Sequence, residues 1–557
     1  MEPLTRDERR TALLAVALTI LPVALDLCHG RPERRMFSLL AADTFYYLTV
    51  ARHVVVDGIV SFDGEHPTNG FHPLWQAITV VVAFLVHAFR ANEAWIPGLS
   101  VVLGLALVGA ASWFSCLACK LAVGFLPEVV LLLPLGASTV LQDAALYSGW
   151  RTLGRASTTL WGAVNGMESA AVLAAFAVCA WAHFRAPRTR AGALGFGVAL
   201  AALTFARLDH VFFALFLGGS LLAGPTAERR FAAIALAVLS GLVGVYLALN
   251  RFYCGMFLPI SGEIKSTFPH VATTNGSLLA SLVLSPRRVP WTHAHRGLQM
   301  LLPALVALGV VRVLARDATR PSPDGVSAPR RFLGATALGV LTLAAYDFLY
   351  VPRTTQGHWY FPVSSAFVSM AALAAWVRFV PGGRAPPVRA SGIRQAIACS
   401  LVIAGYLLVA SIGTDEGLAA FYFDEAPKIR DFYRGKTVKM VEFDDGIVTF
   451  ATGIPAMSGL GLTLDRAAVE ESGGFAAHRT GKARIMDLGV RRGYDRFTVV
   501  GYPHGKVTPK SSSSQIRTAF IGQIAGQLEG CDLALDYVSV PTNFAIVRAS
   551  CRPPRRK

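Results

Sequence analysis

The chain has 557 residues, of which 53% are hydrophobic and 16% charged, and its mean hydropathy is +0.48. This composition is too apolar for an ordinary water-soluble enzyme, so lipid is the expected solvent for most of the chain. The formal net charge of +17 does not indicate a nucleic-acid partner, because the arginines cluster in short segments between apolar runs and no nucleic-acid-binding motif accompanies them.

Uncharged runs close to the ~20 residues needed to cross a bilayer recur along residues 1–412. The first run, Thr11 to Cys28, follows several arginines but lacks a small-x-small cleavage site, so we expect a retained helix and not a signal peptide. Later runs lie near residues 82, 108, 138 and 177, and at 191–206, 208–224, 231–250, 297–315, 332–350 and 359–377. The pattern predicts an α-helical polytopic membrane protein with roughly eleven spanning helices.

Arginine-rich segments orient these helices, because cytoplasmic loops collect positive charge. The segments expected in the cytoplasm are the N-terminus through Arg10, 185–190, 229–230, 312–331 and 378–394. An odd number of apolar runs separates the first two segments, so one run does not cross. We expect this to be Pro73 to Ala88, a short run with His87 and Arg90 near its end, lying re-entrant or at the membrane interface beside a functional cavity. The alternative is a plain spanning helix with a misplaced positive loop elsewhere.

This orientation places residues 29–72, 148–168, 251–296 and 351–358 on the external side, together with the tail. In the tail, short apolar runs alternate with Gly, Pro and Asp, which predicts a small soluble, extracytoplasmic α/β domain over residues 413–557. Cys531 and Cys551 lie in this domain and can pair if it faces an oxidising compartment. The other cysteines are interpreted as small buried hydrophobic residues.

The first external loop is the stretch richest in residues that can carry chemistry. It contains Asp43-Thr-Phe-Tyr-Tyr47, Phe62-Asp-Gly64 and Pro67-Thr-Asn-Gly-Phe-His-Pro-Leu-Trp75. An acid such as Asp43 at the start of a short amphipathic helix suits a general base acting on a membrane-held substrate, with Tyr46 and Tyr47 stacking on a sugar. The alternative is that Asp43 is a helix N-cap and the tyrosines belong to an aromatic belt.

This loop resembles that of the GT-C superfamily of multispanning glycosyltransferases, which often reads D-D-x-F-Y-Y, then F-D-G and T-N-G-x-x-P-L-W. The sequence departs from the pattern at Ala42, where many relatives have a second acid. The resemblance therefore implies that Asp43 is the sole strong candidate for the base, and it argues against a two-carboxylate or metal-bridged mechanism. Asn69 and His72 of the same motif are implied to bind substrate.

Two later motifs follow in the order expected of such enzymes. Asn165-Gly-Met-Glu-Ser169 resembles the family's G-M-E-T and makes Glu168 a second catalytic candidate, although compensation of a helix dipole would also explain it. Ala206-Arg-Leu-Asp-His210 resembles an R-x-D motif that joins two spans on the external side. Arg207 and Asp209 either contact substrate or pair with each other and hold the hairpin.

Further basic residues are candidates for binding a phosphate. Lys265 follows a stretch, Asn250 to Pro259, that the resemblance places near a lipid-borne donor, although bulk lipid headgroups are the alternative ligand. Arg353, His358 and Tyr360 reach the external face before the tenth span, and arginine suits bidentate phosphate recognition.

The resemblance implies an inverting glycosyltransferase. The composition, rich in Ala, Gly and Arg, indicates a bacterium, and the arginine-rich segments place the N-terminus on the cytoplasmic side of its inner membrane. The enzyme would move a sugar from a polyprenyl-phosphate carrier to a glycan, lipid or protein acceptor, with Asp43 as the base. No cofactor is required, although a divalent cation, Mg²⁺ or Mn²⁺, is compatible with the site. Two alternatives stay open: a non-catalytic assembly protein of cell-envelope glycan synthesis that lacks its partner acid at Ala42, and a lipid-linked sugar transporter.

Overall fold

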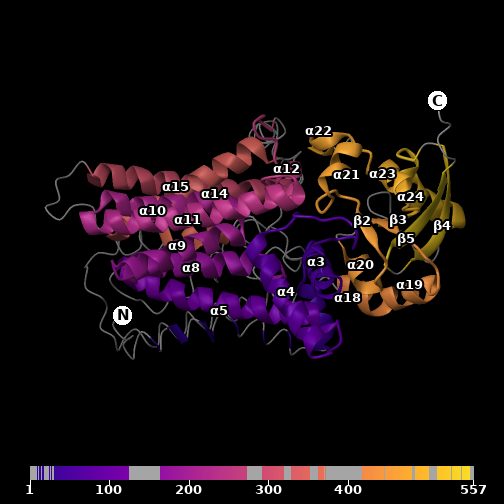
Figure 1. Cartoon of the computed structure of the whole chain (residues 1–557), viewed down its shortest axis with the longest axis horizontal. Helices are drawn as coiled ribbons and strands as arrows, with labels where there is room; N and C mark the ends of the chain where they lie inside the picture. The colour runs from indigo at the N-terminus through magenta and orange to yellow at the C-terminus, as the bar shows by residue number, and fades with distance from the viewer. Residues whose placement is uncertain are drawn as a thin grey trace.

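The structure is a computed structural model with two regions, a bundle of long helices and a mixed α/β region (Figure 1). It describes residues 31–123, 164–272, 291–318, 328–351, 417–443, 446–479, 483–500, 511–528, 530–540 and 542–551, with single positions between 9 and 27 and between 362 and 371.

The long helices of the bundle lie side by side along the longest axis of the molecule (Figure 1). They are α5 (Trp95–Val123), α8 (Ser169–Arg185), α9 (Arg190–Ala206), α10 (Val211–Ser220), α11 (Thr226–Cys254), α14 (Trp291–Ala318) and α15 (Ala328–Tyr350). Such apolar segments form helices because a helix pairs its backbone N–H and C=O groups within the segment, and lipid offers these groups no hydrogen-bond partners.

In the part of the chain that the structure describes, three helices are long and apolar enough to cross a membrane: α5 over Trp95–Ser115, α11 and α15. Only 17% of the most apolar window of α11 is buried, and its Val245, Phe252 and Tyr253 are exposed. Exposed apolar surface on this scale fits a helical membrane protein whose outer helices face lipid. The total of roughly eleven spans stays a prediction.

Helix α4 (Pro73–Ala88) does not follow the direction of the bundle. It has 16 residues, starts with Pro73 at its first turn, and lies obliquely at the end of the bundle next to the α/β region (Figure 1). Helices α5 and α8 both start at that end. That α4 does not cross the membrane and lies re-entrant or at the interface stays a prediction.

The α/β region contains a five-stranded sheet with the order β2-β1-β3-β5-β4. Its elements are α18 (Gly417–Ala420), the π-helical turn η8 (Phe421–Glu425), α19 (Ala426–Tyr433), β1 (Met440–Glu442), α20 (Ile447–Thr452), β2 (Ala456–Ser458), α21 (Arg466–Glu471), α22 (Gly474–Arg479), α23 (Ile485–Arg491), β3 (Arg496–Val500), α24 (Ser513–Ala525), β4 (Cys531–Ser539) and β5 (Phe544–Cys551). Strand β1 pairs in parallel with β2 and β3, whereas β5 pairs antiparallel with β3 and β4.

The sheet packs its helices around an apolar core that includes Val441, Phe497, Phe520 and Val547. Strand β1 is buried at every residue, as expected for a central strand paired in parallel on both sides. Cys531 and Cys551 are register partners on β4 and β5 and form a disulfide, the pairing that the sequence allowed. The predicted boundary near residue 412 lies outside the described residues.

Two helices of the first loop, α2 (Pro32–Leu39) and α3 (Thr44–Val56), contact α18 and α20 of the α/β region, and α12 (Ile260–Lys265) contacts α22. Arg52 on α3 donates to the Phe450 carbonyl (3.2 Å), and Tyr494 donates to Asp63 (3.2 Å). Gly446 packs so closely on α3 that a Cβ there would lie 3.0 Å from the Phe45 carbonyl carbon. The two regions are therefore in direct contact, and the candidate site lies at their junction.

Candidate active site

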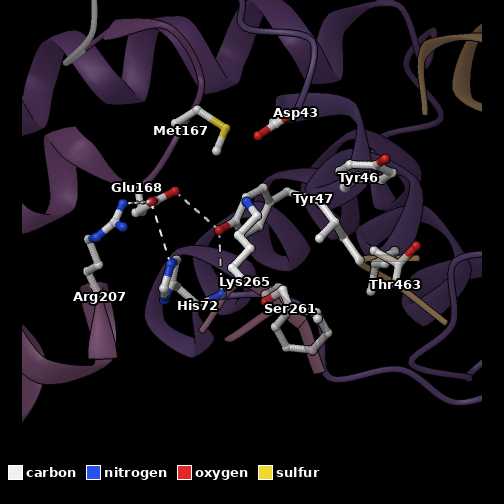
Figure 2. Close-up of a pocket in the computed structure, with 14 residues that line it drawn as sticks. Asp43, Tyr46, Tyr47, His72, Met167, Glu168, Arg207, Ser261, Lys265 and Thr463 are labelled. Carbon is white, nitrogen blue, oxygen red and sulfur yellow. Dashed lines mark hydrogen bonds and ion pairs between the residues drawn. The ribbon is translucent and has the colours of Figure 1, made fainter. Parts of the chain in front are cut away.

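A pocket lies where the first loop, the ends of the bundle helices and the α/β region meet (Figure 2). It is lined by Asp43, Tyr46, Tyr47, Val50, Gly70, Phe71, His72, Met167, Glu168, Arg207, Ser261, Lys265, Leu462 and Thr463. Five separate segments of the bundle region and one of the α/β region contribute to this lining. The structure thus gathers into one pocket most of the site residues predicted from motifs that are far apart in the sequence.

Asp43 occupies the N-cap position of α3, but its side chain makes no capping hydrogen bond. Instead, it is half-buried and lines the pocket. Tyr46 and Tyr47 are only 7% and 5% exposed, so they do not form part of a lipid-facing aromatic belt. The geometry therefore favours a pocket role for these three residues over the alternative of a cap and a belt.

Glu168 is the centre of a buried network on one side of the pocket (Figure 2). Its Oε1 accepts a hydrogen bond from Arg207 (2.8 Å) and lies 3.6 Å from His72 Nε2, and its Oε2 accepts a hydrogen bond from the Tyr47 hydroxyl (3.2 Å). It is also the N-cap residue of α8, without a side-chain cap. The carboxylate therefore orients three pocket residues, and the helix dipole alone does not explain its position.

Burial keeps two members of this network neutral. It lowers the pKa of His72 to about 4, with the positive charges of Arg207 and Lys265 acting in the same direction against the nearby Glu168. Burial and the Glu168 charge raise the pKa of Tyr47 well above its ordinary value. At neutral pH both side chains are hydrogen-bonding groups without charge, so the ionic character of the pocket comes from Asp43, Glu168, Arg207 and Lys265.

Arg207 lies between two carboxylates. In addition to its bond to Glu168, Arg207 donates from Nε to both oxygens of Asp209, at 3.1 and 3.0 Å. The Oδ1 atom of Asp209 also lies 2.7 Å from His210 Nδ1. Arg207 lines the pocket, whereas Asp209 stands behind it and orients it. The sequence left two roles open for this pair, contact with substrate or pairing with each other. Arg207 lines the pocket and also pairs with Asp209, whereas Asp209 only pairs with Arg207.

Asn69 is placed next to the pocket and does not line it. Its amide nitrogen donates to the Leu258 carbonyl (3.3 Å), and its side-chain oxygen accepts from the Ile260 amide (3.1 Å). These bonds tie the first loop to the start of α12, which carries Ser261 and Lys265 into the pocket. Asn69, which the motif predicted to bind substrate, therefore holds one wall of the pocket in place.

The turn before α8 is held by the first loop in a similar way. Thr44 donates to the Asn165 carbonyl and the Trp75 indole donates to the Gly166 carbonyl, both at 2.8 Å. Gly166 has φ of +80°, and a Cβ there would lie 2.5 Å from Thr44. Through these contacts, the first-loop motif and the motif around Glu168 hold each other's backbone in place.

Leu462 and Thr463 complete the pocket from the α/β region, and sequence reasoning did not identify them. No short motif marks them, because they approach the pocket only through the docking of two regions. Arg353, His358 and Tyr360 lie outside the described residues. Among the residues that the structure describes, no group of three or more His, Cys, Asp or Glu side chains is arranged to hold a metal ion.

The whole chain is similar in structure to ArnT from Cupriavidus metallidurans. The similarity covers 96% of this chain and 97% of that one, at 12% identity, with a TM-score of 0.52 for ArnT bound to undecaprenyl phosphate and 0.51 for its apo state. An oligosaccharyltransferase from Archaeoglobus fulgidus matches with a TM-score of 0.45 and 11% identity, over 89% of this chain and 69% of that one. No protein-family model and no curated protein sequence matches the chain.

This likeness shows the fold: the chain shares the fold of ArnT, a GT-C membrane glycosyltransferase, and the resemblance is confirmed at the level of the fold. ArnT is a solved structure to which the chain is similar over nearly its full length.

Proposed function

We propose that the protein is an inverting glycosyltransferase that moves a sugar from a polyprenyl-phosphate carrier to an extracytoplasmic acceptor. The observation that carries the proposal is the convergence of Asp43, Lys265 and the Glu168 network in one pocket, within the fold of a GT-C enzyme. Because ArnT has been seen with undecaprenyl phosphate, a lipid phosphate donor is the substrate class this fold favours.

In the proposed reaction the bond between the sugar's anomeric carbon and the phosphate oxygen breaks, and a bond to the acceptor oxygen forms on the opposite face. Asp43 takes the acceptor proton, which makes the acceptor a better nucleophile. Polyprenyl phosphate leaves with the bonding electron pair, and Lys265 stabilises the negative charge that it carries. Transfer in one displacement inverts the anomeric configuration.

The Glu168 network has a separate role in this scheme. Arg207 is engaged by Glu168 and Asp209, so it contributes a fixed, oriented positive charge to the pocket. Tyr47 and His72 remain neutral and offer hydrogen bonds to sugar hydroxyls. Because these groups are already oriented, they need not rearrange when negative charge develops on the leaving group, so no reorganisation free energy is spent at that step.

We place the protein in a bacterial inner membrane, with the N-terminus in the cytoplasm and the α/β region outside. The Cys531–Cys551 disulfide supports this placement, because disulfides persist in oxidising compartments. The arginine-rich segments support the same orientation. A glycan, lipid or protein acceptor is reached from that side.

The experiment that tests this proposal uses purified protein and a panel of synthetic polyprenyl-phosphate sugars, with candidate acceptors and with or without EDTA. Release of polyprenyl phosphate coupled to transfer of the sugar with inversion is the expected result, and the active donor names the sugar. Movement of the intact donor across vesicles without release would instead identify a transporter. If neither occurs for any donor, the enzyme reading is wrong, and an assembly protein becomes the better account.

A further inference from the structure

A second cavity lies where the ends of α3 and α4 meet the start of α5. Its volume is about 520 Å³, which falls within the ~300–1,000 Å³ typical of small-ligand sites. It is lined by Arg52, Val55, Val56, Ala83, Val86, His87, Ala88, Arg90, Ala91, Glu93 and Ile96. None of these residues lines the candidate active site, so the two cavities are separate.

The polar lining of this second cavity is mainly basic. Arg52, His87 and Arg90 face a single acid, Glu93. The Arg52 side chain is 13% exposed and is held by the Phe450 carbonyl at 3.2 Å and by Glu93 at 3.8 Å. A guanidinium held in a cavity that a second arginine, Arg90, also lines suits an anion with several oxygen atoms, such as a phosphate.

Exposed apolar side chains lie next in sequence to residues that line this cavity. Phe89 is 80% exposed and Trp95 60% exposed, and Phe84 and Leu85 of α4 are also exposed. In a protein that spans a membrane, an exposed aromatic and aliphatic face of this kind contacts acyl chains and the interface. A mostly buried Arg52 and an exposed Arg90 next to such side chains match a molecule with an anionic head and apolar tails.

We propose that this cavity binds an anionic phospholipid, with the phosphate at Arg52 and Arg90 and the acyl chains along Phe84, Phe89 and Trp95. Helices α3 and α4 line this cavity with their C-terminal ends. Their N-terminal ends lie at the active-site pocket, where Tyr47 is in the first turn of α3 and His72 directly precedes α4. A bound lipid therefore braces the α3–α4 pair. The binding itself does not depend on the proposed transferase reaction.

The test titrates phosphatidylglycerol and phosphatidylcholine separately into the full-length protein in detergent and measures the Kd of the first bound lipid by native mass spectrometry. Arg90→Asn is the main variant, because Arg90 has φ of +52° and asparagine tolerates that conformation. We expect its Kd for phosphatidylglycerol to rise about fivefold, as for the loss of one basic group near a membrane surface. Phosphatidylcholine binding is expected to stay unchanged.

Four further arms keep the test independent of folding defects: three variants and a competition with inorganic phosphate. Arg31→Asn removes an exposed arginine outside the cavity and is expected to leave the Kd unchanged. Glu93→Gln removes the acid of the cavity and is expected to tighten phosphatidylglycerol binding. Wild-type Kd values in Arg90→Asn and Arg52→Gln alike would overturn the proposal. Competition by inorganic phosphate at the same concentration as the lipid would also overturn it, because the site would then take a free anion.

Discussion

At the scale of single residues, Glu168 is the side chain on which the pocket depends most. It is 1% exposed and its Arg207 partner 3% exposed, so their ion pair is almost fully removed from water. Removing Glu168 leaves the buried Arg207 charge with Asp209 as its remaining carboxylate partner, and removing Arg207 leaves the buried Glu168 without its arginine. Removing both members of a buried pair costs less than the two separate losses together.

We therefore predict that Glu168→Gln destabilises the protein by about 3 kcal/mol, and that Glu168→Gln with Arg207→Met costs less than the two single changes together. Thermal unfolding in detergent, followed by fluorescence, measures both. Glu93→Gln is the matched control, since Glu93 is 54% exposed and lies 3.8 Å from Arg52, and an ion pair with an exposed partner at this distance contributes little. Additive losses would show that the Glu168–Arg207 pair is not a coupled unit.

His72 gives a pH-dependent prediction at the same scale. Its pKa falls from 6.5 to about 4 because burial disfavours the charged form. Between these values the unfolded chain binds a proton that the folded one does not, so stability is lost as the pH falls from 6.5 towards about 4. His72→Asn removes this group, and its melting temperature should decline less over that range than that of the wild type. Parallel declines would contradict the buried, neutral histidine.

At the scale of elements, the candidate site depends on a close contact between the first loop and the α/β region. A Cβ on Gly70 would lie 1.9 Å from the Leu462 carbonyl oxygen, a distance no real contact allows. The loop that carries His72 and the segment that carries Thr463 therefore fit together only while residue 70 is glycine.

We predict that Gly70→Ala separates these segments and lowers sugar transfer by at least tenfold, with a lower melting temperature, as for an overpacked site. Turnover and thermal unfolding are measured on the same preparation. Gly262→Ala on the adjacent helix α12 is the control, because a Cβ there meets nothing within 4 Å. Equal activity of Gly70→Ala and wild type would mean that the α/β region does not shape the pocket.

The helical elements could be predicted from the sequence because each depends on a local pattern, such as an apolar run. The apolar runs appear as α5, α9, α11, α14 and α15, and the helix expected after Asp43 is α3. It could not predict that Asn69 anchors the loop or that Thr463 reaches the pocket. Both facts depend on contacts across 189 residues or more, such as Asn69 with Leu258, which no local pattern encodes.

At the scale of the whole molecule, the disulfide bears on which side of the membrane the α/β region occupies. Cys531 and Cys551 are 20 residues apart and join β4 to β5 at the edge of the sheet. Closing a loop of this length stabilises a protein by about 3 kcal/mol.

Replacing both cysteines with serine should lower the melting temperature without changing the fold of the bundle. In cells, alkylation of the wild type should modify these two thiols only after reduction, and mass spectrometry of the tail peptides checks this. Cys179 and Cys254 are free and serve as internal controls under denaturing conditions. Thiols at 531 and 551 that react without reduction would contradict an extracytoplasmic α/β region.

The most direct test of the central claim is the turnover of the active polyprenyl-phosphate sugar by Asp43→Asn, beside donor binding by the same protein. We predict that turnover falls about 10²–10⁴-fold, the usual effect of losing a general base, while donor binding and melting temperature stay near wild type. Asp57→Asn, an exposed acid at the other end of α3, should keep full activity. Wild-type turnover in Asp43→Asn would contradict the account, because no protonatable group would then be needed at residue 43.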